Sequence, residues 1–372
     1  MQATKAIIHL DNLRWNIKAA RKIIGPRPKI CIAVKADGYG HGAVNISLCA
    51  LEAGVEYLAV ARVSEAAEVR AAGINAPILV LSQAQPEELP RVVSLDLIPL
   101  VSDAEFIDEI AGAAEHAGKK ITVHLKVDTG MGRLGCHTED AVSLAAKIFS
   151  GKNLYLGGVA THLSVADSLI PEDITYTKEQ LSKFREIVSS MKNAGIDPGI
   201  VHAANSGALV YHDDSYFDMI RPGLFLYGYS PAYGMDKASL PRIKPVMELQ
   251  SEVVLVKKVK KGSFISYGRT WKAPEDTFLG VIPAGYADGF PRKLSNDHSV
   301  YIRGKSYPLV GRICMDQCMV NLGPETEVKR WDKAMIFGPG FITAADMAEK
   351  LGALPYEIFC GINKRVPREY TG

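Results

Sequence analysis

Lys35 is placed where a lysine side chain can do chemistry. It follows the apolar stretch Ile30–Val34 and precedes the run Ala36–Gly42, which is too rich in glycine for a helix or a strand and predicts a loop. A lysine at such a strand end can carry a carbonyl cofactor as a Schiff base, provided that burial or nearby cations lower its pKa from about 10.4. The alternative interpretation is a surface lysine beside a turn, which is the common position for this residue type.

Further polar segments stand where other predicted strands end, and they favour the chemical interpretation. They are rich in cations, acids, hydroxyls and amides, and they are His124–Gly135, Thr161–His162, His202–Gly207 and Arg221–Gly228. In a parallel barrel the carboxyl ends of all strands point to one face, where residues far apart in sequence build one site. The pattern therefore predicts an active site at that face.

Eight short apolar stretches predict the strands that position these segments. They are Ile30–Val34, Tyr57–Val60, Ile78–Leu81, Leu97–Val101, Ile121–Val127, Leu154–Ala160, Ile200–His202 and Phe217–Ile220. Helical stretches separate them, so residues 11–243 are predicted to form an α/β domain, a (β/α)8 TIM-type barrel. An open doubly wound sheet is the alternative that alternation alone would allow.

Three helix starts are predicted from polar residues that precede helix-periodic stretches. Asp11 is expected to cap the first helix. Two capping boxes are expected to begin later helices, at Ser102 with Glu105 and at Thr177 with Gln180.

The pattern changes near Pro241 and Pro245, which indicates a domain boundary. Residues 244–372 are rich in β signals separated by glycine and proline turns, and they predict a mostly β C-terminal domain. Strands are expected over 253–259, 279–282, 300–302, 309–315 and 334–337. The N-terminal strand within residues 1–10 is expected to pair with this domain, because the barrel already has its eight strands.

Composition agrees with a soluble two-domain enzyme of 372 residues, 47% of them hydrophobic and 23% charged. A net charge of +2 gives no reason to expect nucleic acid or an anionic membrane as partner. With neither a transmembrane-length apolar run nor a secretory leader, the expected location is the cytoplasm. The six dispersed cysteines are expected to be free thiols in a reducing compartment, and no metal site is expected.

The motifs occur in the order found in bacterial alanine racemases, and the chain resembles that family over nearly its whole length. Besides the segments at the strand ends they include Ile265–Trp271, Pro283–Gly289, Gly311–Gln317 and Arg365–Arg368. The family has a pyridoxal 5′-phosphate barrel followed by a β domain, and works as a head-to-tail homodimer with shared active sites. The resemblance implies interconversion of L-alanine and D-alanine, which supplies D-alanine for peptidoglycan.

The resemblance also implies the two catalytic bases. Racemisation removes a weakly acidic Cα proton and returns one on the opposite face, so a base is needed on each side. Lys35 would hold the cofactor and act on one face, and Tyr267 of the partner subunit would act on the other. His162 and Arg221 would help a phenol of ordinary pKa about 10 to act near neutrality. The alternative for Tyr267 is a half-buried strand aromatic with its hydroxyl in water.

Several residues are implied for cofactor binding by the resemblance. Arg221 would face the pyridine nitrogen, where a guanidinium can only donate and so disfavours protonation of that nitrogen. Tyr39, Ser206 and the backbone amides of residues 223–224 would bind the phosphate. The full implied set is Lys35, Tyr39, His162, Asn205, Ser206, Arg221, Gly223, Leu224 and Lys364.

The resemblance further implies that Arg133 and the backbone amide of Met315 bind the substrate carboxylate. It also implies that Asp316 lies beside Tyr267 and that Tyr286 narrows the entrance to the site. In many family members the lysine at position 126 is carbamylated, which turns a cation into an anion that holds the arginine. The alternative is an unmodified Lys126 paired with Asp128.

Lys364 departs from the family pattern, in which most members have tyrosine at this position. A lysine can bind phosphate as a point charge but does not wall the channel like an aromatic ring. We therefore expect a looser entrance and some activity on serine. Two rival classes remain at this stage, another enzyme of the same fold type, such as a serine racemase or a decarboxylase, and a non-catalytic pyridoxal-phosphate carrier. The Tyr267 motif and the β domain speak against the decarboxylase and the carrier.

Overall fold

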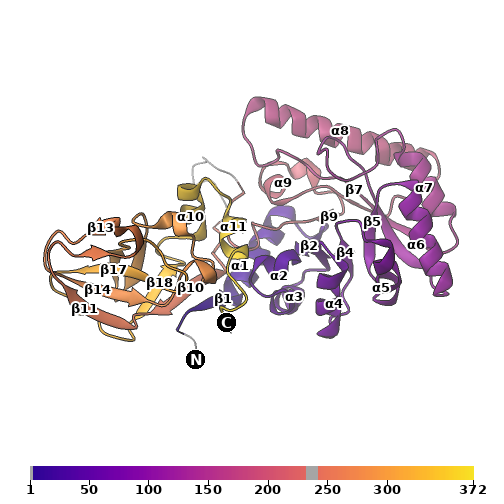
Figure 1. The fold of residues 1–372 in the computed structure, drawn as a ribbon. Coiled ribbons are helices and arrows are strands. Elements are labelled where there is room, and N and C mark those ends of the chain that lie inside the picture. Colours follow the sequence, from indigo (N-terminus) through magenta and orange to yellow (C-terminus); the bar gives the residue numbers. More distant parts are fainter. Residues whose placement is uncertain (1–2, 232–241) are drawn as a thin grey trace. The chain divides into compact units, whose positions relative to one another are not determined.

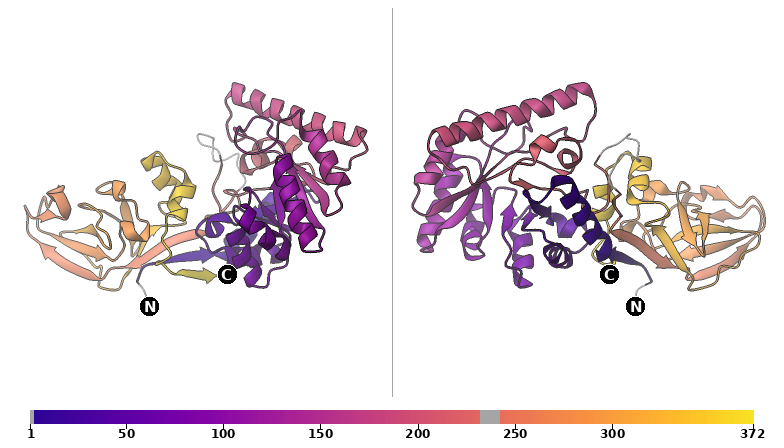
Figure 2. Two further views of the ribbon diagram at one scale, coloured as in Figure 1. Left: turned by 45° about the vertical axis from the view of Figure 1, so that its right-hand side comes forward. Right: turned by 180° about the vertical axis from the view of Figure 1, so that it is seen from behind.

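The computed structural model describes residues 3–231 and 242–372 and divides into two compact units, shown in Figures 1 and 2. The barrel unit is made of residues 13–38 and 43–243, and the β unit of residues 1–12, 39–42 and 244–372. Of the two prolines at the expected boundary, Pro241 lies outside the described residues, as do residues 1–2 of the expected N-terminal strand.

Eight parallel strands form the centre of the barrel unit, in the spatial order β8-β7-β6-β5-β4-β3-β2-β9. They are β2 Lys29–Ala33, β3 Tyr57–Val60, β4 Ile78–Val80, β5 Ile98–Val101, β6 Ile121–Lys126, β7 Leu154–Ala160, β8 Ile200–His202 and β9 Met219–Ile220. The two ends of this order meet just before β9, where the amide of Asp218 donates to the carbonyl of Val201 at 3.0 Å. The predicted (β/α)8 barrel is therefore confirmed, and the open doubly wound sheet is wrong.

Helices alternate with these strands along the chain (Figure 1). They are α1 Leu10–Ile24, α2 Lys35–Tyr39, α3 Ala43–Glu52, α4 Val63–Ala71, α5 Leu89–Ser94, α6 Ala104–His116, α7 Ala141–Ser150, α8 Pro171–Asn193 and α9 Ser206–Tyr211. Helix α1 shows why they pack, because Leu13, Ile17, Ala20 and Ile24 recur every three or four residues and are all buried. No helix in the described part of the chain combines the length and the apolar character needed to cross a membrane.

None of the three predicted helix starts is observed as predicted. The helix starts near Asp11 and Thr177 lie at other residues, and the cap near Ser102 is the next residue along the chain. Helix α1 begins at Leu10, so Asp11 lies in its first turn rather than at its cap. Helix α8 begins at Pro171, since proline suits the first helical position, and both Thr177 and Gln180 are buried in its interior. Helix α6 is capped by Asp103 and not by Ser102, because the Asp103 carboxylate accepts from the amide of Phe106 at 2.8 Å.

This cap gives a prediction about stability. We expect Asp103→Ala to lower the free energy of unfolding by about 1 kcal/mol, the usual effect of losing an N-cap. Ser102 donates only to the Asp103 carboxylate, at 3.3 Å, so Ser102→Ala should cost less than about 0.5 kcal/mol. Urea unfolding of the two variants would check this, and an equal or larger loss in Ser102→Ala would restore the serine as the cap.

The β unit contains three sheets, with strand orders β16-β15-β18-β10-β1-β19, β11-β14-β17 and β12-β13. The strands are β1 Lys5–His9, β10 Met247–Glu252, β11 Leu255–Val259, β12 Phe264–Ile265, β13 Trp271–Lys272, β14 Thr277–Ile282, β15 Ser299–Ile302, β16 Lys305–Pro308, β17 Cys318–Gly323, β18 Lys333–Phe337 and β19 Arg368–Thr371. Strand β1 lies between antiparallel β10 and parallel β19, so the first and last strands of the chain are neighbours.

Two predicted strands of the β unit are wrong in detail. The stretch 253–259 begins with a break between β10 and β11. The stretch 309–315 is not a strand but a loop with a single bridge from Leu309 to Val320 and a turn closed by Cys314 N and Gln317 O at 2.9 Å. Pairing with β17 stops after the amide of Val310, which donates to Met319 O at 2.8 Å. The amides of Gly311 and Ile313 donate to the side chains of residues 296 and 295 instead. Two helices, α10 Ala344–Leu351 and α11 Pro355–Cys360, complete the unit.

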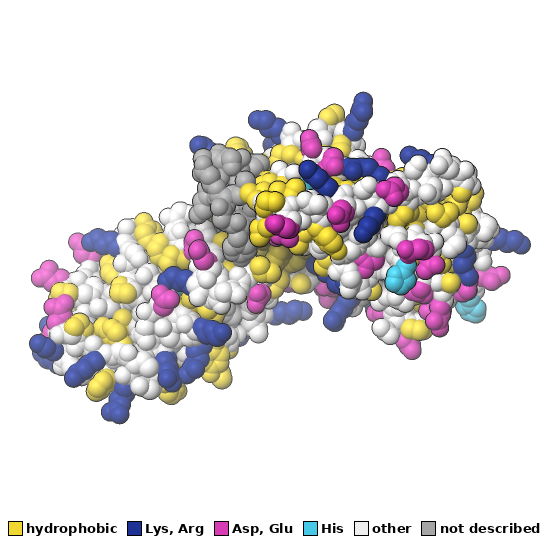
Figure 3. Space-filling view, turned by 90° about the horizontal axis from the view of Figure 1, so that it is seen from above, with side chains coloured by type: hydrophobic (Ala, Val, Ile, Leu, Met, Phe, Trp, Pro, Cys, Tyr) yellow, Lys and Arg dark blue, Asp and Glu magenta, His cyan; other side chains and the backbone are white. Residues whose placement is uncertain are grey.

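Charges of both signs are mixed on the surface. On the face seen in Figure 3, Lys and Arg side chains are interspersed with Asp and Glu side chains, in keeping with the small net charge of +2. Within residues 3–231 and 242–372, no cluster of three or more His, Cys, Asp or Glu side chains is arranged to hold a metal ion. The six cysteines are free.

Candidate active site

Lys35 stands directly after β2, at the carboxyl end of the barrel strands. The segment after it is not the predicted loop but a turn of left-handed helix, since Ala36, Asp37 and Gly38 have φ of 51°, 55° and 60°. This conformation costs roughly 1–2 kcal/mol for each residue with a Cβ, so other contacts must stabilise it. Gly38 N donates to Val34 O at 2.8 Å, and the Asp37 carboxylate accepts from Ala43 N at 2.9 Å.

Arg221 follows β9 and joins the ends of three strands. Its Nη2 donates to the carbonyl of Thr161 at 2.7 Å and to that of Ala203 at 3.2 Å, and lies 3.3 Å from His162 Nδ1. Its Nη1 donates to His202 Nδ1 at 2.7 Å. Burial lowers the pKa of Arg221 to about 10, so the guanidinium remains a cation near neutral pH.

A pair of buried histidines supports Arg221. Because Arg221 donates to His202 Nδ1, the proton of His202 must lie on Nε2, which donates to His124 Nδ1 at 2.8 Å. Burial, reinforced by the charge of Arg221, lowers the pKa of His124 to about 3 and also lowers the pKa of His202. Both imidazoles are therefore neutral near pH 7. Neither histidine was predicted to have a role, although both stand at strand ends.

These neutral histidines predict how stability depends on pH. An unfolded histidine binds a proton below about pH 6.5, whereas folded His124 does so only near pH 3. The unfolded state therefore binds more protons in this window, and the free energy of unfolding must fall as pH falls from 6.5, by about 1.4 kcal/mol per pH unit for each such histidine.

Replacing one of the histidines tests this pH dependence. In His124→Asn the free energy of unfolding should depend less steeply on pH between pH 6.5 and 4.5. The decrease in slope should correspond to about one fewer proton taken up on unfolding, measured by urea unfolding at several pH values. The absolute stability of the variant is expected to be lower at every pH because the side chain is smaller. A slope equal to that of the parent protein would show that His124 is protonated in the folded state.

Lys126 ends β6 and is only 8% exposed. Burial, together with the charges of Arg221 and Arg133, holds its pKa well below the ordinary value. Asp128 accepts from the amides of residues 130–132 at 2.8–3.2 Å, and no ion pair between Lys126 and Asp128 is found among the described side chains. The expected alternative of a Lys126–Asp128 pair is therefore not seen.

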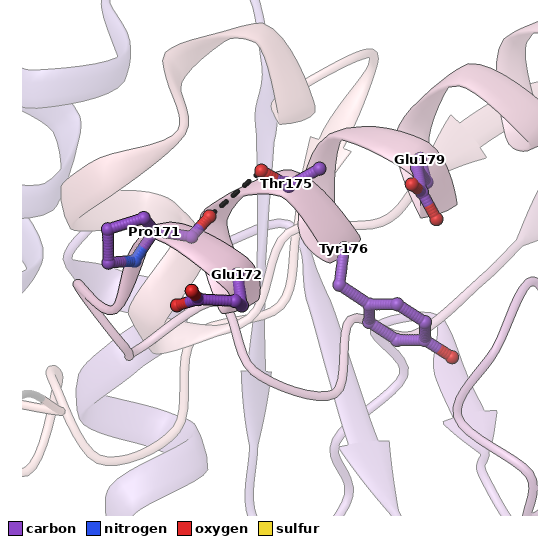
Figure 4. A pocket seen from close by; sticks show the side chains of 5 residues that line it. All are labelled: Pro171, Glu172, Thr175, Tyr176 and Glu179. Carbon is purple, nitrogen blue, oxygen red and sulfur yellow. Dashed lines mark hydrogen bonds between the residues drawn. The ribbon is translucent and has the colours of Figure 1, made fainter.

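The loop that carries Arg133 is anchored to α8. Tyr176 donates from its hydroxyl to the carbonyl of Gly130 at 2.7 Å. Figure 4 shows Tyr176 in a surface pocket at the start of α8, where Thr175 donates to Pro171 O at 2.8 Å. Arg133 itself is exposed.

Ser206 opens α9 beside the segment that follows Arg221. Its Oγ accepts from the amides of Gly223 at 2.9 Å and Phe225 at 3.2 Å. Asn205 caps the helix, since its Oδ1 accepts from Ala208 N at 3.0 Å, and its Nδ2 donates to Leu163 O at 3.1 Å. Backbone amides and a hydroxyl thus gather at one place, a donor set that suits an anion.

Lys35 lies within electrostatic reach of His162. The pKa of His162 is lowered by burial and by the charges of Arg221, Lys126, Arg133 and Lys35, in that order. The barrel unit therefore brings together the lysine, the arginines and the histidine that the sequence analysis took from separate segments.

Tyr267 lies in the β unit, in the 3₁₀ turn η4 Tyr267–Arg269, and is 71% exposed. It is therefore not a half-buried strand aromatic. Ser266, with φ of 65°, donates from its hydroxyl to Arg312 O at 2.6 Å. Asn296 accepts from Gly311 N at 2.6 Å and donates to Thr270 at 3.1 Å. These bonds tie the tyrosine turn to the loop that precedes Met315.

Met315 and Tyr286 lie on two loops that are paired by backbone bonds. Tyr286 N donates to Cys314 O and Ala287 N donates to Met315 O, both at 3.0 Å. A Cβ on Gly285 would lie 2.3 Å from Met315 O, so only glycine allows this close approach. Both side chains are exposed, Met315 by 52% and Tyr286 by 43%.

A salt-bridge pair joins these loops to the C-terminal segment. Arg365 donates from Nε to Asp288 at 2.7 Å and from Nη2 to Asp316 at 2.8 Å. Asp316 is thus bound to Arg365, next to exposed Lys364. Tyr39, also in the β unit, is buried and its ring lies 4.9 Å from that of Tyr356.

A barrel with cations and neutral histidines at its strand ends, followed by a β unit with an exposed tyrosine, defines a barrel enzyme of two units. The chain matches the family models "Alanine racemase, N-terminal domain" over residues 8–231 and "Alanine racemase, C-terminal domain" over residues 246–370. It is 50% identical to an alanine racemase of Treponema denticola, covering 99% of this chain and 98% of that protein.

Solved structures give the same result. Alanine racemase of Clostridium difficile 630 superposes with a TM-score of 0.94 at 35% identity, covering 100% of this chain and 96% of that one. The Bacillus anthracis alanine racemase with bound L-Ala-P has a TM-score of 0.92 at 33% identity, with coverage of 100% and 96%. The protein therefore belongs to the alanine racemase family and is an amino-acid racemase.

Proposed function

We propose that the protein interconverts L-alanine and D-alanine with pyridoxal 5′-phosphate as cofactor, using Lys35 and Tyr267 of the partner subunit as its two bases. The observation that carries the proposal is the position of Lys35, at the carboxyl end of β2 and close enough to His162 for its charge to affect that imidazole. A strand-end lysine in a pocket of cations suits covalent attachment of a carbonyl cofactor.

The residues present fit this cofactor. For the phosphate we propose Ser206 and the amides of Gly223 and Leu224, with Tyr39, Asn205 and Lys364 added from the family resemblance. The contact of the Gly223 amide with Ser206 Oγ, at 2.9 Å, supports this grouping. Arg221, which is half-buried, would donate to the pyridine nitrogen, and His162 lies beside it. When bound, pyridoxal phosphate withdraws electrons from the Cα of the attached amino acid.

Arg221 determines how strongly the ring nitrogen is protonated in this proposal. A guanidinium has donors and no acceptor, so it disfavours a proton on the nitrogen that it contacts. The histidine pair keeps it in place, because His202 accepts from Nη1 and is itself held by His124. We infer that this arrangement limits side reactions such as transamination.

The two bases act on opposite faces of the same carbon. Lys35 removes or returns a proton at one face, and Tyr267 does so at the other. The exposure of Tyr267, at 71%, and of neighbouring Met315 suits side chains that complete the site of a second protomer. The proposal therefore includes a head-to-tail homodimer, with residues 11–243 as the cofactor-binding domain and residues 244–372 contributing to the partner's site.

For the substrate carboxylate we propose Arg133 and the amide of Met315, with Tyr286 narrowing the entrance and Asp316 supporting it. We place the enzyme in the cytoplasm, where free thiols stay reduced, and assign its D-alanine to peptidoglycan.

Lys126 is proposed to carry a carbamate. The reaction joins a neutral amine to carbon dioxide and releases one proton, and the lowered pKa of this buried lysine supplies the neutral amine. The resulting anion would offset the neighbouring charges of Arg133 and Arg221. We expect protein equilibrated with ¹³C-bicarbonate to show a carbamate ¹³C signal that disappears in Lys126→Ala. The same signal in the variant would place the carbamate elsewhere.

Lys364 leads to a proposal about specificity. We expect it to widen the entrance and to allow some activity on serine, since a pocket for a methyl group rejects a slightly larger group only modestly. In Lys364→Tyr the ratio of kcat/KM for serine to that for alanine should fall, by about tenfold. Comparable ratios in the variant and the parent enzyme would count against a role for Lys364 in specificity.

One assay tests the proposal as a whole. Purified protein should be yellow from bound cofactor and should form D-alanine from L-alanine in a chiral assay. Colour without D-alanine would favour the non-catalytic carrier, and serine preferred over alanine would favour a serine racemase.

A further inference from the structure

Glu65 links the turn that follows Lys35 to the next strand of the barrel. It stands in the first turn of α4, and its Oε1 accepts from the amide of Ala36 at 2.7 Å. Its Oε2 accepts from the amides of Ala61 at 2.7 Å and Arg62 at 3.1 Å. One carboxylate therefore joins the end of β3 to the residue immediately after the cofactor lysine.

The contact falls where the backbone most needs support. Ala36 and Asp37 adopt left-handed conformations that are unfavourable for residues with a Cβ. Hydrogen bonds to a charged acceptor are among the stronger ones, so the bond from Ala36 to Glu65 stabilises the strained turn at its first residue. Two further hydrogen bonds support the later part of the turn. The amide of Gly38 donates to Val34 O, and the amide of Ala43 donates to the Asp37 carboxylate.

We propose that Glu65 is a positioning residue for Lys35, and this inference rests on the proposed function. By fixing the Ala36 amide relative to β3, the carboxylate sets the direction in which the Lys35 backbone presents its side chain. Glu65 needs no contact with cofactor or substrate for this role. A misplacement of about 1 Å can reduce turnover by about 100-fold, so a support of this kind matters for rate.

A first test does not depend on activity. Amide hydrogen exchange of the segment 35–39 in the protein as purified should become roughly tenfold faster or more in Glu65→Ala, because the Ala36 amide loses its acceptor. Glu88→Ala is the matched control, since Glu88 also accepts a first-turn amide, that of Gln85 at 3.0 Å, without reaching the lysine turn. Exchange of residues 35–39 should be unchanged in the control.

A second test separates positioning of Lys35 from a general loss of folded enzyme. We expect kcat to fall about 10- to 100-fold in Glu65→Ala, with a smaller change in KM. With substrates deuterated at Cα, the isotope effect on kcat/KM should rise for the enantiomer whose proton Lys35 removes and fall for the other. Tyr267→Phe should give the opposite pattern, and a smaller folded fraction would change neither isotope effect.

The outcomes are distinct. Unchanged exchange of residues 35–39, or unchanged isotope effects in both directions, would overturn the role of Glu65. If Glu65→Ala does not fold, Glu65→Gln replaces it, because the amide keeps the size but can accept from only one of the two sides. An active Lys35→Ala enzyme would instead reject the proposed function, whatever the Glu65 variants show.

Discussion

Lys35→Ala should reduce racemisation by at least about 10⁴-fold and remove the yellow colour of the purified protein. The variant loses both the proposed attachment point of the cofactor and the base on one face. Lys126, whose charge also acts on His162, is buried at the end of a different strand and is therefore not expected to replace Lys35. The measurements are the visible absorbance and the chiral assay in both directions.

Lys29→Ala is the matched control for this experiment. Lys29 lies on the same strand, β2, but at its amino end, where it contacts the ring of Tyr57 at 5.9 Å. Active sites of such barrels lie at the carboxyl end, so the control should keep its colour and activity. Equal losses in the two variants would mean that the strand, rather than the Lys35 amine, was affected.

Tyr267→Phe should lower kcat/KM by about 10²- to 10⁴-fold while cofactor colour is retained. The hydroxyl is the only group removed, and the exposed ring makes few contacts in its own unit. Because enantiomers have equal free energies, kcat/KM must fall equally for L-alanine and D-alanine. Tyr155→Phe serves as the control for loss of an exposed phenol, since Tyr155 is 55% exposed near the amino end of β7, and it should change activity much less. A Tyr267→Phe enzyme as active as the parent would exclude the phenol as a base.

The same two variants test whether active sites are shared between subunits. Lys35→Ala and Tyr267→Phe proteins, dissociated and paired again at random, should regain roughly a quarter of the parent activity. Half of the dimers are then mixed, and one of their two sites has both bases intact. No recovery would place lysine and tyrosine of one active site on the same chain.

The barrel was predictable because its strands are short, continuous apolar runs, which is what burial on both faces requires. The starts of the helices were harder to predict from the sequence. Ser102 and Asp103 are both residue types that cap helices well, and only the backbone geometry decides that Asp103 is the cap of α6. The stretch 309–315 has the composition of a strand, but its pairing with β17 is limited to its first residues. Beyond them, the side chains of residues 295–296 accept from two of its amides.

The candidate site was predictable where the residue type itself indicates a chemical role, as for Lys35 and Arg221. The supporting residues were not. Glu65 acts on backbone amides of a segment 29 residues away, and His124 acts on Arg221 only through His202. Such roles depend on which atoms meet in space, and neither glutamate nor histidine is unusual in a helix or a strand.

The position of β1, between β10 and β19, bears on how the chain folds as it is synthesised. Its parallel neighbour β19 is separated from it by almost the whole described chain, so the six-stranded sheet can be completed only after β19 has been synthesised. The eight barrel strands, which end with β9 Met219–Ile220, need no later strand for their pairing and can form during translation. Removal of either β1 or β19 would therefore damage the same sheet and leave the pairing of the eight barrel strands intact.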